Sequence, residues 1–141
     1  MSYKNEMQLK FLSLSENESF ARLAVASFCS NTNLTIEDIS DIKTAVSEAV
    51  TNSIVHGYSD NLGFIELSCV IDNSLITIKI KDNGCGIENI DEAIKPFFTT
   101  RPDMERSGMG FTVMEGFMDS MTVESQKGEG TTITLIKKIQ K

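Results

Sequence analysis

Two segments of alternating apolar residues constrain the fold of this chain more than any other feature. Every second residue is apolar in Ile65–Ile71 (IELSCVI) and again in Ile76–Ile80 (ITIKI), and a polar turn, Asp72–Ser74, separates them. A period of two places the apolar side chains of a strand on one face and the polar ones on the other. The pattern therefore predicts a β-hairpin with one apolar face that another layer must cover.

Helical patterns supply that second layer. A capping sequence at Thr35–Asp38 begins a helix whose apolar stripe continues to about His56, where Gly57 is expected to end it. Further helices are predicted over residues 17–30 (from Phe20, Leu23, Ala24 and Phe28), 91–95 and 111–119; further strands over 6–14, 121–125 and 131–137; and a long loop over 96–110. Strands that pair antiparallel, with helices on one face, predict an α+β two-layer sandwich.

Size and composition exclude several classes of protein. The chain has 141 residues, which suits a single domain over 1–141, and its longest apolar run is only four residues, Leu23–Ala26, so neither a membrane span nor a signal peptide is expected. Thirteen basic residues against 20 acidic ones give a net charge of −7, which argues against a general nucleic-acid binder and favours a basic partner. Three widely spaced cysteines without a CxxC indicate a reduced, cytoplasmic setting and no zinc site.

Three polar residues of the long predicted helix are spaced four apart. Glu48, Asn52 and His56 lie about 40° apart around the helix axis, because each residue advances by about 100°. Residues in such a row commonly form a solvated face. The alternative is a site for a hard cation such as Mg²⁺, bound by a carboxylate and a carboxamide oxygen together with water and phosphate.

Glycines mark two further candidate sites. Asp82–Gly86 (DNGCG) follows a predicted strand and is either a plain turn or a place where a ligand approaches the backbone, with Asp82 accepting a hydrogen bond from an amino group. Glu105–Gly110 (ERSGMG) precedes a predicted helix, whose first N–H groups attract phosphate oxygens. A third Gly-x-Gly, Gly128–Gly130, is expected to be a hairpin turn. None of them is a Walker A loop or a complete dinucleotide fingerprint.

The order and spacing of these segments resemble the ATP-binding fold shared by gyrase, Hsp90, histidine kinases and MutL, the GHKL superfamily. Within it, SEAVTNSIVHGY, PFFTT and ERSGMGFTVMEGFMD are similar to stretches of the anti-sigma factor serine kinases of spore-forming bacteria. The resemblance runs from about Phe11 to Thr134. It implies a two-layer α/β sandwich with a mixed, mostly antiparallel sheet, ATP and Mg²⁺ as cofactors, and a homodimer.

The resemblance also implies roles for individual residues. Glu48 matches a proposed general base, and Arg106 matches a lid arginine beside the terminal phosphate, so both are expected to be catalytic. Asn52 matches the Mg²⁺ ligand, Asp82 the carboxylate that reads the adenine amino group, and Arg22 a surface arginine used against protein partners. The implied nucleotide-binding residues are Asn52, Asp82, Gly84, Gly86, Thr99, Ser107, Gly108, Met109, Gly110 and Thr131.

The function that the resemblance implies is twofold. The chain is expected to bind and silence a sporulation sigma factor, and to transfer phosphate from ATP to a serine of its anti-anti-sigma partner, without contacting nucleic acid or membrane. Two alternatives stay open: a related switch kinase that acts on a general stress sigma factor, and a non-catalytic module that sequesters sigma with ATP as a structural ligand. A two-component sensor kinase is not expected, because no separate dimerisation helix carries another histidine.

Overall fold

Strands and helices follow one another in the predicted order. The computed structural model describes residues 4–87, 90, 94 and 110–139. The elements are β1 (Lys4–Leu12), α1 (Glu16–Cys29), α2 (Ile36–Asn52), η1 (Ser53–Tyr58), β2 (Phe64–Asp72), β3 (Leu75–Asp82), α4 (Gly110–Phe117), β4 (Ser120–Gln126) and β5 (Gly130–Lys138). Every strand predicted from the alternating pattern is present, so the periodicity of the sequence predicts the strands and their order.

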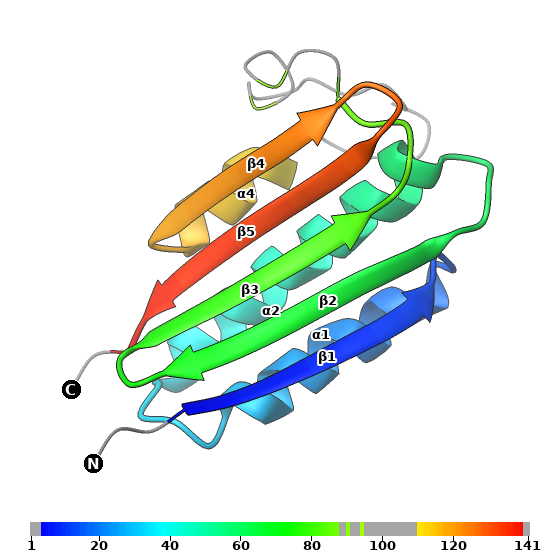
Figure 1. Ribbon diagram of the computed structural model, residues 1–141. Helices are drawn as coiled ribbons and strands as arrows, with labels where there is room; N and C mark the ends of the chain where they lie inside the picture. Colours follow the sequence, from blue (N-terminus) through cyan, green and yellow to red (C-terminus); the bar gives the residue numbers. More distant parts are fainter. Residues whose placement is uncertain (1–3, 88–89, 91–93, 95–109, 140–141) are drawn as a thin grey trace.

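The strands form one five-stranded sheet in the order β1-β2-β3-β5-β4, and all neighbours in it are antiparallel. A mixed sheet was implied, but no parallel pair occurs among the described strands. The connections explain this difference. Between β1 and β2 the chain runs back along α1 and forward along α2, so β2 returns antiparallel to β1 (Figure 1). Short turns join β2 to β3 and β4 to β5, which makes these pairs antiparallel as well.

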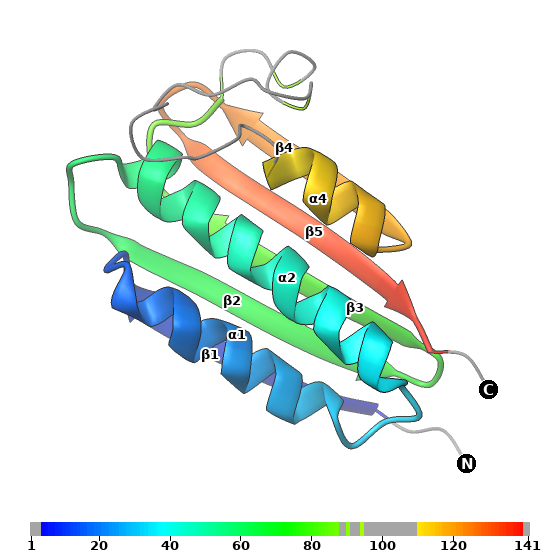
Figure 2. The ribbon, with the colours of Figure 1, turned by 180° about the vertical axis from the view of Figure 1, so that it is seen from behind.

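The α-helices of the described residues, α1, α2 and α4, all cover the same face of the sheet (Figure 2). α1 and α2 lie side by side, and α4 packs against α2. The alternating residues of the predicted hairpin point into this layer and are buried: Ile65, Leu67, Cys69, Ile71, Ile76, Ile78 and Ile80. The core therefore lies between one sheet and one layer of helices, and the predicted two-layer sandwich is confirmed.

The face of α1 that enters this core differs from the expected one. Phe20 and Leu23, the large residues of the predicted stripe, are 53% and 54% exposed. The buried residues are instead Ala21, Val25 and Cys29. Small side chains let the helix approach the sheet closely, so the fit to the neighbouring layer selects the face, and the size of the apolar residues does not.

The cysteines are free thiols. Cys29 and Cys69 are buried, and their sulfur atoms lie 3.9 Å apart between α1 and β2. The contact with Cys29 and burial both raise the pKa of the Cys69 thiol, so Cys69 packs as a small, protonated side chain. Cys85 is exposed.

The long helix begins with the predicted capping box. Thr35 Oγ1 accepts a hydrogen bond from the Asp38 N–H at 3.0 Å, and Asp38 Oδ2 accepts one from the Thr35 N–H at 3.3 Å. These two bonds satisfy backbone donors at the start of the helix that have no partner within it. The predicted start of α2 is confirmed.

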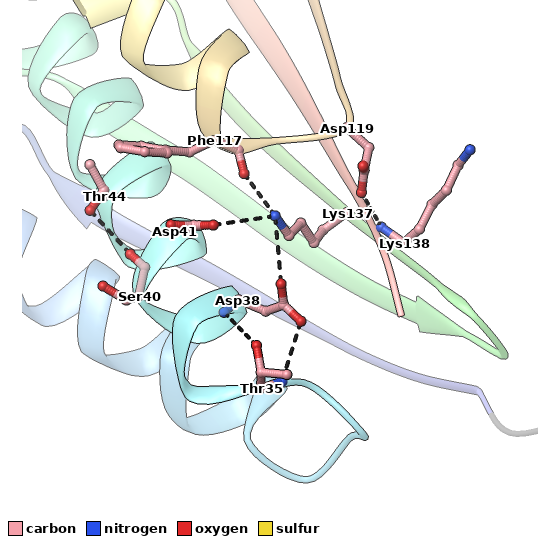
Figure 3. A network of polar contacts seen from close by, with 9 residues as sticks. All are labelled: Thr35, Asp38, Ser40, Asp41, Thr44, Phe117, Asp119, Lys137 and Lys138. Carbon is pink, nitrogen blue, oxygen red and sulfur yellow. Dashed lines mark hydrogen bonds and ion pairs between the residues drawn. The ribbon is translucent and has the colours of Figure 1, made fainter. Parts of the chain in front are cut away.

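A polar network joins α2, α4 and β5 near this capped end (Figure 3). The Lys137 ammonium group on β5 donates to the carbonyl of Phe117, the last residue of α4, at 2.8 Å. The same nitrogen lies 3.6 Å from Asp41 Oδ2 and 3.9 Å from Asp38 Oδ1 on α2. The Lys137 side chain is only 11% exposed. One cation thus holds the C-terminal end of α4 against the first turns of α2.

Two predicted segments fall mainly outside the described residues. Of the short helix 91–95 only Ile94 is described; its N–H donates to the Ile90 carbonyl at 3.1 Å, the spacing of one helical turn. Of the loop 96–110 only Gly110 is described, and it begins α4. Within the described ranges, no helix is long and apolar enough to span a membrane.

We expect Lys137→Met to lower the free energy of unfolding by about 1–2 kcal/mol, because the variant loses a hydrogen bond to a carbonyl and leaves two neighbouring carboxylates without their cation. Urea unfolding measures the change. Lys138→Met is the matched control, since the neighbouring Lys138 is exposed. Equal midpoints for the two variants would show that the network does not contribute to stability.

Candidate functional site

Several elements meet at the end of the sheet opposite the Lys137 network. β3 ends there with Asp82, β5 begins there with Gly130, and the register places Asp82 beside Thr131. α2 also reaches this end and continues into η1, while α4 begins at the same end (Figures 1 and 2). The structure therefore brings together three predicted features: the Asp-x-Gly-x-Gly segment, Thr131 and the end of the helix that carries Asn52.

The long helix does not end at Gly57 as expected. After Asn52 it widens into a π-type turn, η1, and the positive φ that ends it, 54°, falls on Ser59. Gly57 is needed for a different reason. A Cβ on Gly57 would lie 2.9 Å from the carboxylate atoms of Asp82, so the absence of a side chain lets the helix approach that carboxylate. The prediction considered the conformational freedom of glycine, whereas its small size is what this position uses.

Asp82 is a buried acid with one unpaired oxygen. The residue is 1% exposed. Its Oδ1 accepts a hydrogen bond from the Gly84 N–H at 2.9 Å, but its buried Oδ2 has no hydrogen-bond partner among the described residues. Burial raises the pKa of the Asp82 carboxyl, and the backbone N–H of Gly84, the Ser53 side chain and the backbone of Thr131 oppose this shift. A buried acceptor without a donor destabilises a folded protein, and such a group often marks a binding site.

The glycines after Asp82 are in contact with protein backbone. A Cβ on Gly84 would overlap the Gly57 carbonyl of η1, and one on Gly86, whose φ is +75°, would overlap the Gln126 carbonyl of β4. A Cβ on Gly130 would likewise overlap the backbone at the end of β3. These glycines were expected to let a ligand approach the backbone; in the structure, other segments of the protein make the close approach, which joins β3, η1 and the β4–β5 turn. The expectation that Gly84 and Gly86 also lie under a bound base stays a prediction.

A shared hydroxyl holds the other side of this segment. Ser125 Oγ on β4 donates to the Gly130 carbonyl at 2.9 Å and accepts from the Ile87 N–H at 2.7 Å. The same oxygen lies 2.8 Å from Thr131 Oγ1. Thr131 is 4% exposed, so its hydroxyl is a buried group with a partner, next to Asp82. The Gly128–Gly130 segment is the hairpin turn that was expected, and φ is positive at both glycines.

Glu48 and Asn52 lie on the last turns of α2, and both are half-buried. Glu48 borders a surface depression of about 260 Å³ between α1 and α2, which Arg22 also lines. Its lining residues are Arg22, Ser40, Lys43, Thr44, Ser47 and Glu48. Arg22 Nε lies 3.1 Å from the Glu18 carboxylate, which orients the guanidinium group along α1. The structure thus places the predicted base and the predicted partner-binding arginine at one depression.

The available ligands would suit Mg²⁺ better than zinc. Among the described residues, no three histidine, cysteine, aspartate or glutamate side chains are close enough to hold a metal ion. Asn52 would supply a carboxamide oxygen from the last turn of α2, with the Glu48 carboxylate one turn before it. Mg²⁺ is usually bound by one or two protein oxygens, with water and phosphate as its other ligands, whereas zinc needs three or four nitrogen, sulfur or oxygen ligands from the protein.

The remaining predicted site residues belong to the segment before α4. Thr99, Arg106, Ser107, Gly108 and Met109 lie outside the described residues, and Gly110 is the first residue of α4.

Sequence reasoning missed three residues that shape the site. Gly57 was expected only to stop a helix, and Tyr58 and Ser125 were not singled out. The Tyr58 hydroxyl and Ser125 Oγ each bind backbone groups of two different elements. A serine in a strand and a tyrosine at a helix end carry no pattern that identifies such a bridge. The signal for Gly57 was available: a glycine inside an otherwise continuous helical period can mark a close contact.

Comparisons with known proteins agree with this architecture. The model of the histidine kinase-like ATPase domain matches residues 11–137. The anti-sigma F factor of Clostridium acetobutylicum is 58% identical over 135 residues, which cover 96% of this chain and 94% of that protein. The anti-sigma F factor of Thermoanaerobacter pseudethanolicus is 55% identical over 139 residues, which cover 99% of this chain and 97% of that protein. The resemblance inferred from the sequence motifs is confirmed.

Solved structures support the fold. A crystal structure of the RsbU and RsbW domains of a Mycobacterium tuberculosis protein aligns with a TM-score of 0.67 at 18% identity, over 94% of this chain and 31% of that chain. The histidine kinase domain of a blue-light activated kinase from Erythrobacter litoralis aligns with a TM-score of 0.51 at 17% identity, over 85% of this chain and 59% of that one. This chain spans less than two thirds of either, and the likeness concerns the fold alone.

We expect Gly84→Ala to lower the free energy of unfolding by about 2–4 kcal/mol, because the new methyl group would overlap a backbone carbonyl that cannot move without displacing η1. Gly116→Ala is the matched control. A Cβ on Gly116 meets nothing within 4 Å on the surface of α4, so this variant should be neutral or slightly stabilised by alanine's higher helix propensity. Thermal and urea unfolding measure both variants. A neutral Gly84→Ala would contradict the described packing.

Asp82 should make the stability of the nucleotide-free protein depend on pH. Because the pKa of Asp82 is raised in the folded state, its contribution is fully present below the unfolded pKa, about 4, and is lost as the pH rises through the folded value. Relative to Asp82→Asn, the unchanged protein should therefore lose stability from about pH 4 upward. Urea unfolding at a series of pH values tests this. Asp72→Asn, at the exposed end of β2, is the control. If the stability of all three proteins changed with pH in the same way, the raised pKa of Asp82 would be refuted.

Proposed function

Because the chain belongs to the histidine kinase-like ATPase domain family and, within it, to the anti-sigma F factors, we propose that it is an ATP-dependent protein serine kinase that also sequesters a sigma factor. Its kinase substrate is a serine of an anti-anti-sigma protein, and its sigma partner directs transcription during sporulation. The proposal includes Mg²⁺ as a cofactor and a homodimer as the working form. ATP occupies the end of the sheet where Asp82 and Thr131 meet.

The observation that carries this proposal is the unpaired oxygen of Asp82. Oδ2 is buried, accepts no hydrogen bond within the described residues, and belongs to the residue that matches the adenine-reading carboxylate. An amino group of a base supplies the donor that this oxygen lacks. Thr131, beside Asp82 in the register, supports that contact with its backbone and its anchored hydroxyl. A hydrophobic core position would not hold an unpaired acid, so a polar ligand explains it best.

The phosphates and the metal ion are assigned to the residues around the end of α2. Asn52 holds Mg²⁺ through its carboxamide oxygen, and the cation, when bound, offsets the charge of the phosphate oxygens. Arg106 adds a positive charge beside the terminal phosphate, where negative charge builds during transfer. Thr99, Ser107, Gly108 and Met109 are assigned to nucleotide binding by the resemblance, and Gly110, at the N-terminus of α4, adds a helix start that favours anions.

The acceptor serine approaches from the outer side of the helices. Glu48 accepts the proton of the serine hydroxyl as a general base, and it borders the depression that contains Arg22 and Lys43. Two basic side chains beside three hydroxyl-bearing ones suit a partner with acidic residues near its docking segment. Arg22 is accordingly proposed as a partner-binding residue. The chain's net charge of −7 suits the basic surface of a sigma factor.

Two other functions fit the fold, and the experiments described below distinguish them from the proposed one. A switch kinase that acts on a general stress sigma factor would have the same site but a different partner. A non-catalytic module would bind ATP and sigma without transferring phosphate. The carboxylate of Glu48, retained at the position of the base, favours the enzyme.

We expect Glu48→Gln to bind ATP as tightly as the unchanged protein but to transfer phosphate about 10²–10⁴-fold more slowly, since the amide keeps the shape of the side chain and cannot accept a proton. Calorimetry with ATP and Mg²⁺ measures binding, and labelled ATP with an anti-anti-sigma protein measures transfer. Glu37→Gln, on the exposed first turn of α2, is the control.

The outcomes distinguish the alternatives. Loss of both binding and transfer in Glu48→Gln would argue against a general base. ATP binding without transfer by the unchanged protein would leave the sequestering module. No heat of binding with saturating ATP and Mg²⁺ would refute the nucleotide site. Transfer to an anti-anti-sigma protein of a general stress pathway, and not of sporulation, would identify the other switch kinase.

A further inference from the structure

We propose that Tyr58 is a positioning residue for the base of the nucleotide, and that its hydroxyl fixes the segment that carries Asp82. The inference rests on the proposed function, because it assumes that Asp82 reads the base. It adds a residue that touches no predicted ligand and that controls how selective the site is between adenine and guanine nucleotides.

The Tyr58 hydroxyl bridges the two ends of the central hairpin. It donates to the Phe64 carbonyl at 2.5 Å, where β2 begins, and accepts from the Asn83 N–H at 2.8 Å, directly after β3 ends. Asn83 is the residue next to Asp82. The phenol is the hydrogen-bond partner of the first amide after the predicted base-reading carboxylate, and a phenylalanine ring would leave that part-buried N–H without it.

The ring itself is held in one place. Tyr58 is 9% exposed, and a Cβ on Gly63 would overlap the Tyr58 ring, so the loop before β2 packs directly against its face. Ser59, the next residue, has φ 54° and ψ −118°, a conformation that side chains rarely adopt. Strained backbone of this kind persists when surrounding contacts determine it and is common at functional sites. The end of η1 is therefore shaped to deliver this hydroxyl.

Other contacts hold the same segment, and Gly130 packs against the Asn83 Cα atom, but the Tyr58 hydroxyl is the group that accepts a hydrogen bond from the Asn83 N–H. Gly57 contacts the Asp82 carboxylate, and its carbonyl accepts from the Cys85 N–H at 2.8 Å. The Gly84 N–H binds Asp82 Oδ1. Without the bond from Tyr58, the Asn83 N–H loses this acceptor, and the peptide that joins Asp82 to Asn83 can reorient within the space left by Gly130, which shifts the direction of Oδ2.

Base selectivity is the property that such a rotation affects. Adenine presents an amino group where guanine presents a carbonyl oxygen, so a fixed carboxylate attracts the first and repels the second. When the carboxylate is less well placed, ATP loses affinity and GTP is excluded less strictly. If Tyr58 only stabilised the fold, its replacement would lower the unfolding temperature but would leave the ratio of ATP affinity to GTP affinity unchanged.

The test compares Tyr58→Phe with Thr32→Val. Thr32 also donates a part-buried hydroxyl to a backbone carbonyl, that of Cys29 at 2.7 Å, but in the loop between α1 and α2 at the other end of the molecule. Calorimetric titration with ATP and with GTP, both with Mg²⁺, is made on each variant and on the unchanged protein. We expect Tyr58→Phe to bind ATP about tenfold more weakly and to lower the ratio of ATP affinity to GTP affinity by a similar factor. The kcat for phosphate transfer should stay unchanged at saturating ATP.

Thr32→Val should retain both the affinity and the ratio. If the original protein prefers ATP and Tyr58→Phe keeps the same ratio of ATP affinity to GTP affinity, the inference is overturned and the proposed function still stands. If the original protein does not bind ATP, the proposed function itself is refuted. If Tyr58→Phe does not fold, Gly63→Ala provides the second measurement, since its methyl group displaces the ring, and the same loss of selectivity is expected.

Discussion

A single carboxylate oxygen, buried at the end of β3 without a donor, is the constraint around which this end of the molecule is built. An unpaired acceptor of this kind destabilises the folded chain, because it has left water and gained no hydrogen bond. The apolar face of the sheet, which packs against the helices, offsets that penalty. The fold can therefore retain one buried, unpaired polar group at this end, and the proposed function gives that group a ligand.

Backbone contacts, more than side-chain contacts, hold that oxygen in place. Gly84 and Gly86 pass between η1 on one side and the turn of β4 and β5 on the other, at distances that leave no room for a Cβ. Hydroxyl groups at the edges of this crossing, on Tyr58 and Ser125, bind the backbone groups that the sheet leaves free. A carboxylate on such a segment has little freedom to adjust, which suits recognition of a flat, rigid base.

The sequence predicted the layers and the order of the elements, because hydrophobic periods and capping residues act locally. The hairpin from Ile65 to Ile80 and the capping box at Thr35 are cases in which the local signal and the final structure agree. The prediction of the buried face of α1 was wrong because Ala21 and Val25 fit the neighbouring sheet better than the larger Phe20. A local sequence pattern holds no information about that neighbouring sheet. The same reason explains Gly57, whose constraint is a carboxylate 25 residues further along the chain.

The candidate site was predicted in a different way. Asp82 and Thr131 were assigned by resemblance, and the register now places them side by side. The resemblance did not provide the reason for their position: a serine on β4 and a tyrosine at the end of a π-type turn, which bind backbone groups of segments far apart in the sequence. Bridges of this kind depend on three-dimensional closure, and a residue type alone does not reveal them.

The pairing of β3 with β5 also has a consequence for synthesis of the protein. Asp82 is translated well before Gly130 and Thr131, which form the other half of its surroundings. A nascent chain that still lacks β5 exposes the edge of β3 and has no wall on that side of the carboxylate. The surroundings of this carboxylate can thus close only after β5 has left the ribosome.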